Sequence, residues 1–213
     1  KPERWFARAG EPGLFTCTWP KTPYIAEGVR YKNEIWTGIE YQVAGNMVWE
    51  DMLDEALAIC YGIQQRYHPA KHNPFNEVEC GDHYARAFAS WGVYTALAGY
   101  EYHGPKGHLG FAPRITSEDF RAAFTCAEGW GTFSQKQKGK TQREEIEVRW
   151  GRLRLKSLAF AVPDNLQRVK VSITAAGKTV EADYALNDGR LDIILKKDLT
   201  LSEGQTLEVK ITP

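Results

Sequence analysis

The stretch Val169–Leu195, VKVSITAAGKTVEADYALNDGRLDIIL, decides the fold of the C-terminal part of the chain. Apolar and polar residues alternate in three short runs, and a strand points successive side chains to opposite faces. The dipeptides Ala176-Gly177 and Asp188-Gly189 separate the runs and are typical of tight hairpin turns. The pattern therefore predicts antiparallel strands with one buried face.

The same alternation extends this prediction toward both sides. It returns at 207–211 and, before the stretch, at 148–160. We therefore predict a compact, antiparallel, β-rich C-terminal domain over residues 143–213. The Lys-, Gln- and Gly-rich segment Ser134–Gln142 in front of it is predicted to be a solvated loop or linker.

The first hundred residues follow a helical period instead. Apolar residues recur every three or four positions over Glu34–Trp49 and again over Asp51–Tyr67, which ends before Pro69. A third helix is predicted from the N-cap Asp82 to about Ala98. Helices with broad apolar faces need a partner layer, so we expect these three to be a slice of a larger helical array.

Composition argues against several classes of partner. Lys plus Arg and Asp plus Glu number 27 each, so no net field attracts nucleic acid or anionic lipid. No apolar run approaches the roughly 18 residues of a membrane-spanning helix, so no transmembrane segment is expected. The sequence opens at Lys1 with an aromatic stretch close behind, and we expect it to be cut from a longer protein whose N-terminal part is missing. A signal peptide is therefore not assessable.

The four cysteines are far apart in the sequence and form no C-x-x-C pair, which argues against a zinc knuckle or a redox dithiol. They are Cys17, Cys60, Cys80 and Cys126. Reduced, packed thiols are the simpler expectation, and this usage is typical of a cytoplasmic-type compartment.

Titratable residues and aromatics concentrate in the segment His68–Arg86, HPAKHNPFNEVECGDHYAR. Glu77-Val78-Glu79 is predicted to be extended, with both carboxylates on one side and Val78 pointing into the core. Arg86 lies on an apolar helical face, where a guanidinium needs a carboxylate or a polar ligand. Glu77 and Arg86 therefore either bind sugar hydroxyls together or form an internal ion pair.

Other residues of this segment have simpler interpretations. His68 and His72 are four apart, but Pro69 breaks the helix that would align them, so no metal and no other cofactor is expected. Asp82 is predicted to be a helix cap, and His68 and His83 to be structural.

Glu77 and Glu79 could form an acid/base pair, but side chains two apart on a strand point in parallel. Glycosidic chemistry needs carboxyls on opposite sides of the anomeric carbon, which makes this pairing unfavourable. Trp36 and Tyr84 are candidates for stacking on a sugar, because each stands at the start of a predicted helix.

Three stretches resemble the C-terminal catalytic region of glycoside hydrolase family 116, the retaining β-glucosidases that include the non-lysosomal glucosylceramidase. They are NEIWTGIEYQVAGNMVWE, HNPFNEVECGDHYARAFASWGVYTALAGYEYHGPKG and LGFAPRI. The resemblance covers roughly residues 5–135. It implies that residues 1–135 hold the last helices of an (α/α)6 toroid, which a β-sandwich domain normally precedes.

The resemblance also implies roles for individual residues. The Glu and Arg of the family's segment line the subsite of the terminal glucose, near its 4- and 6-hydroxyls, and these roles fall on Glu77 and Arg86. Glu79, Trp36 and Tyr84 are further candidates for substrate binding.

The family's catalytic nucleophile, a Glu, and its acid/base, an Asp, lie upstream and have no counterpart in this chain. We therefore expect part of a hydrolase of terminal β-glucosides that is inactive alone. The alternative is a non-catalytic carbohydrate-binding or scaffold fragment.

Overall fold

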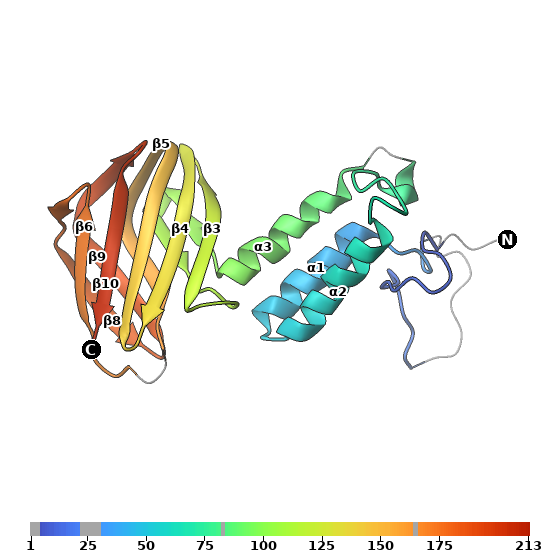
Figure 1. Cartoon of the computed structure of the whole chain (residues 1–213), viewed down its shortest axis with the longest axis horizontal. Coiled ribbons are helices and arrows are strands. Elements are labelled where there is room, and N and C mark those ends of the chain that lie inside the picture. Colours follow the sequence, from blue (N-terminus) through green and yellow to red (C-terminus); the bar gives the residue numbers. More distant parts are fainter. Residues whose placement is uncertain (1–4, 22–30, 82–83, 164–165) are drawn as a thin grey trace. The chain divides into compact units, whose positions relative to one another are not determined.

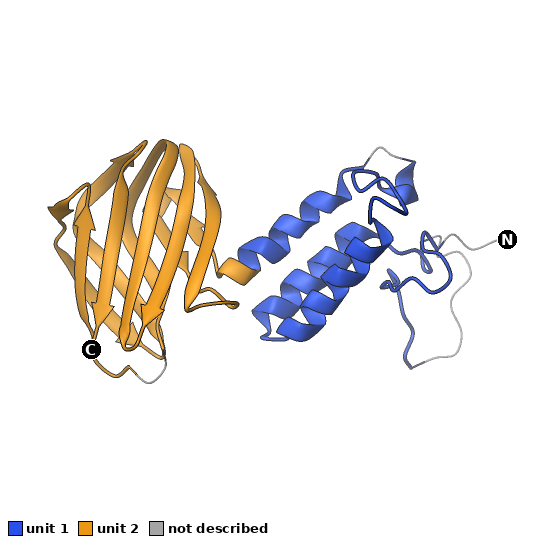
Figure 2. Ribbon diagram, viewed as in Figure 1, with its two compact units in different colours: residues 1–96 blue, residues 97–213 orange. Residues whose placement is uncertain are grey.

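The computed structural model describes residues 5–21, 31–81, 84–163 and 166–213. The chain divides into two compact units, Lys1–Ala96 and Leu97–Pro213 (Figure 2). The first unit is helical and the second is almost entirely β-sheet. The sequence placed the change of domain between residues 135 and 143, whereas the first strand already begins at Glu101.

The helical unit contains α1 (Thr37–Trp49), α2 (Leu53–Arg66), the 3-10 turns η1 (Val78–Cys80) and η2 (Arg86–Ala89), and most of α3 (Ser90–Ala98). Helices α1 and α2 lie side by side (Figure 1), since only three residues connect them. Helix α1 also approaches α3 closely, because a Cβ atom at Gly45 would lie 3.4 Å from the backbone of Gly92.

Two predictions about this unit are wrong in detail. The third helix does not run continuously from residue 82, because η2 precedes α3 and the α-helix begins only at Ser90. Val78 is 36 % exposed and belongs to η1, where Cys80 N–H donates to the Glu77 carbonyl at 3.2 Å. This turn ends the extended backbone after Glu77, so Val78 does not point into the core. Asp82 and His83 lie outside the described residues.

The β unit forms two layers that share one long strand, β5 (Thr141–Ala161). The first layer has the order β3-β4-β5-β10-β6-β7 and uses the first half of β5. The second layer has the order β1-β2-β5-β9-β8 and uses the second half. The strands are β1 (Glu101–His103), β2 (His108–Phe111), β3 (Asp119–Cys126), β4 (Gly129–Lys138), β6 (Lys170–Ala175), β7 (Lys178–Thr179), β8 (Ala182–Asn187), β9 (Arg190–Ser202) and β10 (Thr206–Thr212), with the 3-10 turn η3 (Gly104–Lys106) after β1.

Aromatic rings from both layers form the core of this unit. The rings of Phe111 on β2 and Phe133 on β4 stack with centroids 3.8 Å apart, and Phe160 on β5 stacks on Phe133 at 6.1 Å. All three side chains are buried. Among the strand pairs of the described residues, all are antiparallel except β2 with β5, which is parallel. The predicted β-domain is therefore present, and it begins earlier than residue 143.

The predicted linker Ser134–Gln142 is wrong. Strand β4 continues to Lys138, β5 begins at Thr141, and Gly139 turns the chain between them with φ +60°. The polar composition suggested a loop, but Gln135 and Gln142 point inward and are 1 % and 2 % exposed. No helix among the described residues is long and apolar enough to cross a membrane.

Candidate functional site

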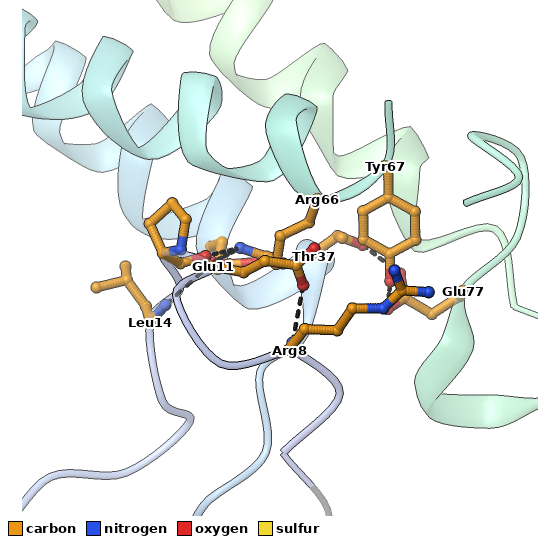
Figure 3. Close-up of polar contacts among 9 residues, drawn as sticks. Arg8, Glu11, Leu14, Thr37, Arg66, Tyr67 and Glu77 are labelled. Atoms are coloured by element: carbon orange, nitrogen blue, oxygen red, sulfur yellow. Dashed lines mark hydrogen bonds and ion pairs between the residues drawn. The ribbon is translucent and has the colours of Figure 1, made fainter. Parts of the chain in front are cut away.

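Glu77 lies where the start of α1 and the end of α2 meet, and its carboxylate is held from both sides (Figure 3). The Thr37 hydroxyl donates to Oε2, and the Tyr67 hydroxyl donates to Oε1 at 3.0 Å. Glu77 is only 3 % exposed, and its backbone is extended before η1 begins. A carboxylate oxygen accepts more than one hydrogen bond, so each oxygen still has capacity for a ligand hydroxyl.

Burial raises the pKa of the Glu77 carboxyl, whereas the hydrogen bonds from Thr37 and Tyr67 and the charge of Arg86 oppose this rise. The pKa of the Tyr67 phenol is also raised. Burial, followed by the negative charge of Glu77, raises the Tyr67 pKa well above its ordinary range. Tyr67 therefore remains a hydrogen-bond donor at neutral pH.

A cavity of about 50 Å³ adjoins the Glu77 carboxylate. Its polar lining includes Thr37, Tyr41, Tyr67 and Asn76, and Tyr84 also borders it. Small-molecule pockets usually enclose at least roughly 300 Å³, so this cavity is too small for a whole hexose ring. It has room for a small polar group such as a hydroxymethyl or a water molecule.

Arg86 pairs with Glu79 rather than with Glu77. Its Nε donates to Glu79 Oε2 at 2.9 Å, and its terminal nitrogen lies 2.8 Å from the same oxygen. The guanidinium also lies over the rings of Trp36, at 4.5 Å, and Tyr84, at 4.8 Å. The bonds to Glu79 use only part of its five N–H donors, and the two aromatic faces fix its plane.

Trp36 and Tyr84 thus lie beside the same guanidinium although 48 residues of sequence separate them. Trp36 occupies the N-cap position of α1, so the helix begins at Thr37 and not at the predicted Glu34. Tyr84 is 57 % exposed, so a large part of its side chain is available to solvent. Helix α1 passes close to Arg86 at this point, since a Cβ atom at Gly38 would meet the Arg86 side chain at 3.5 Å, an ordinary contact distance.

Sequence reasoning missed Thr37 and Tyr67 as partners of Glu77, and it also missed Glu34. The Glu34 side chain is 1 % exposed, and its Oε2 accepts a hydrogen bond from the Trp36 indole at 2.8 Å. The available signal was position, because Glu34, Trp36 and Thr37 all fall in the first of the three stretches that carry the family resemblance.

A buried ion pair joins Glu40 on α1 to Arg66, the last residue of α2 and the neighbour of Tyr67. Arg66 Nη1 donates to Glu40 Oε1 at 3.0 Å and to the Pro12 carbonyl at 2.6 Å, and a second bond joins Nη2 to Oε2. The backbone N–H of Leu14 donates to the same carboxylate (Figure 3). The pair therefore ties the segment around residues 12–14 to both α1 and α2.

The two histidines considered as metal ligands make local contacts. The Nδ1 atom of His72 lies 2.8 Å from the Arg66 carbonyl, and His68 Nδ1 accepts from the Ala70 backbone at 3.2 Å. Within the described part of the chain, no group of three or more His, Cys, Asp or Glu residues could hold a metal ion. All four cysteines are free thiols.

No family model and no curated protein matches this sequence. Among solved structures, the chain is similar to an alpha-L-rhamnosidase from Dictyoglumus thermophilum, with 11 % identity and a TM-score of 0.36 over 60 % of this chain and 14 % of that one. It is also similar to a structure described as a glycoside hydrolase, with 14 % identity and a TM-score of 0.33 over 59 % of this chain and 19 % of that one. The chain thus spans less than a fifth of the length of these two structures.

Proposed function

We propose that the helical unit contributes to the glucose subsite of a retaining glycoside hydrolase that cleaves terminal β-glucosides. The observation that carries the proposal is the buried Glu77 carboxylate, which borders a small cavity of mixed polar and apolar lining and is held by Thr37 and Tyr67. A buried carboxylate with acceptor capacity suits the vicinal hydroxyls of a sugar. The resemblance of residues 33–50 and 72–107 to the β-glucosidase family supports the same assignment.

In this proposal the cavity receives the 6-hydroxymethyl group, and the sugar ring remains outside it. The volume of about 50 Å³ favours a group of this size. Glu77 accepts from the 6-hydroxyl, while Arg86 donates to the neighbouring 4-hydroxyl with the N–H groups that Glu79 does not use. Trp36 and Tyr84 keep the guanidinium plane in place, and the exposed part of Tyr84 offers a stacking surface.

The chemical step follows the double displacement of retaining enzymes. A nucleophilic Glu attacks the anomeric carbon while an Asp protonates the leaving oxygen, and water then hydrolyses the glycosyl-enzyme. Both carboxylates are proposed to come from outside residues 1–213, so this chain alone should not hydrolyse an aryl β-glucoside above background. Its contribution is to hold the non-reacting end of the glucose, which positions the anomeric carbon.

The test replaces Glu77 by Gln and Arg86 by Lys in the complete enzyme that the proposal predicts. Hydrogen bonds to charged groups contribute roughly 1.5–3 kcal/mol, so each substitution should lower kcat/KM on an aryl β-glucoside by about ten- to a hundredfold. The matching β-xyloside lacks the 6-hydroxymethyl group and should lose much less with Glu77→Gln. Glu55→Gln, on the exposed side of α2, is the matched control and should change neither constant.

The remaining alternative is that Glu77 and Arg86 only brace the fold. In that case both variants would unfold at lower temperature, because breaking a buried polar contact destabilises the native state. Their constants on glucoside and xyloside would stay at wild-type values. That combination of results would refute the sugar contact.

A further inference from the structure

Two tryptophans of the β unit lie directly opposite each other on adjacent strands. Trp130 on β4 pairs with Trp150 on β5, and directly opposite residues of an antiparallel pair share one face of the sheet. Trp130 is 47 % exposed and Trp150 is 59 % exposed, although large aromatic side chains usually bury most of their surface. Residues Gly131 and Phe133 line the opposite, inner side of β4. The two indoles therefore form an outward-facing aromatic pair.

Glycines bracket this pair and hold the strands close together. A Cβ atom at Gly129 would lie 2.3 Å from the Trp150 carbonyl oxygen, and one at Gly151 would lie 2.2 Å from the Glu128 carbonyl oxygen. Only glycine permits such approaches, and Gly151 also has φ +74°. The backbone beneath the indoles is therefore closely packed.

Charged side chains stand next to the pair and form ion pairs with one another. Glu128 accepts from Arg152 Nε at 3.0 Å and from Arg154 Nε at 2.6 Å, and the hydrogen bond from Arg152 lowers the pKa of Glu128. Glu128 lies within four residues of Trp130 in the sequence, and Arg152 and Arg154 lie within four residues of Trp150. The bonds to Glu128 use only part of the N–H donors of each arginine, so donors remain for a ligand.

We infer that Trp130 and Trp150 form a binding surface for a neutral oligosaccharide, separate from the glucose subsite of the helical unit. Sugar rings present apolar C–H faces that stack on indoles and hydroxyls that bond to flanking charged groups. A neutral ligand fits because carboxylates and guanidiniums are already paired around the tryptophans. The choice of a β-linked glucan as the probe rests on the function proposed above.

A protein partner fits this surface less well. Specific protein interfaces bury about 800 Å² on each side around an apolar centre. Here most of the outward positions that adjoin the two tryptophans are polar or charged. These positions are Thr125, Thr132, Glu147 and Arg149.

The test titrates the 213-residue chain with cellohexaose and follows binding by calorimetry and tryptophan fluorescence. Trp130→Ala and Trp150→Ala should each weaken binding by at least about tenfold, as expected when a central aromatic contact is removed. Trp150→Tyr should retain part of the affinity. The matched control is Trp91→Ala, which removes a tryptophan of the helical unit that is 57 % exposed and should leave the affinity unchanged.

Circular dichroism of each variant checks that the sheet is intact. Absence of binding by the folded wild-type chain would overturn the inference, and so would wild-type affinity in both alanine variants. Loss of binding in Glu77→Gln but not in the tryptophan variants would assign the sugar to the helical subsite alone and would also overturn it. Conversely, loss of cellohexaose binding in the tryptophan variants, together with normal binding by Glu77→Gln, would support this surface whether or not the helical unit holds the proposed glucose subsite.

Discussion

Replacing Glu144 by Gln should stabilise the β unit at neutral pH. Glu144 is completely buried on the inner side of β5, where its neighbours across the strands are Gln135 and Val209. Gln142 donates to its Oε1 at 2.6 Å, and Oε2 has no hydrogen-bond partner within the described residues. Burial raises the pKa of this carboxyl from 4.5 to about 8, and the bond from Gln142 offsets only part of the rise.

The direction of the pH dependence follows from the protons that Glu144 binds in the folded and unfolded states. Between pH 4.5 and about 8 the folded chain holds a proton on Glu144 that the unfolded chain has released. The free energy of unfolding therefore falls as pH rises through this window, by about 1.4 kcal/mol for each pH unit from this group alone. At pH 7 the accumulated loss is about 3 kcal/mol, and it levels off above pH 8.

A glutamine has the shape of the neutral acid and still accepts from Gln142, but it does not titrate. Glu144→Gln should therefore match the wild type near pH 4 and exceed it by about 3 kcal/mol at pH 7. Hydrogen exchange of peptides from β5 and β10, corrected for the intrinsic effect of pH, measures this difference in the free energy of unfolding within the β unit. The control is Glu145→Gln, whose side chain lies on the outer side of the same strand. Parallel pH profiles for wild type and Glu144→Gln would refute a neutral, buried Glu144.

Three further substitutions test the packing of each unit. Arg66→Leu leaves the buried Glu40 carboxylate without its cation and should lower the free energy of unfolding by about 3–5 kcal/mol in urea denaturation, whereas an unchanged midpoint would contradict a buried pair. Gly131→Ala places a Cβ atom 2.1 Å from the Glu147 carbonyl oxygen, so exchange at the β4–β5 contact should accelerate markedly, and wild-type protection would be inconsistent with this close approach. Phe133→Ala removes the central ring of the inter-layer stack and should cost about 3–5 kcal/mol by thermal unfolding, with a cost below about 1 kcal/mol arguing against that core.

Local sequence patterns predicted the secondary structure correctly where the buried residues are also the hydrophobic ones. The alternation in Val169–Leu195 predicted strands that the structure places at β6, β8 and β9. The turn dipeptides are confirmed too, since both residues of Ala176-Gly177 and of Asp188-Gly189 have positive φ. The helix predicted over Asp51–Tyr67 is present as α2, because its apolar period and the following proline are both local signals.

The site could be located from the sequence but not assembled. The concentration of Glu, Arg and aromatic residues in His68–Arg86 indicated the segment that contains the buried Glu77. The extended geometry expected for residues 77–79 was wrong, because the backbone closes into η1 and leaves Arg86 paired with Glu79. Thr37 is 40 residues away from Glu77, so no spacing rule could have joined them.

By itself the sequence determined the two classes of secondary structure, the strands β5, β6, β8, β9 and β10, the helices α1 and α2, and the segment in which polar chemistry concentrates. Only the tertiary structure decided that β4 and β5 form a hairpin in place of a linker, and that Glu144 is buried with its glutamine neighbours. Hydrophobic periodicity identifies a buried residue by its apolar side chain. A polar residue becomes stable in a core only through hydrogen bonds from other elements, and these partners exist only once the chain has folded.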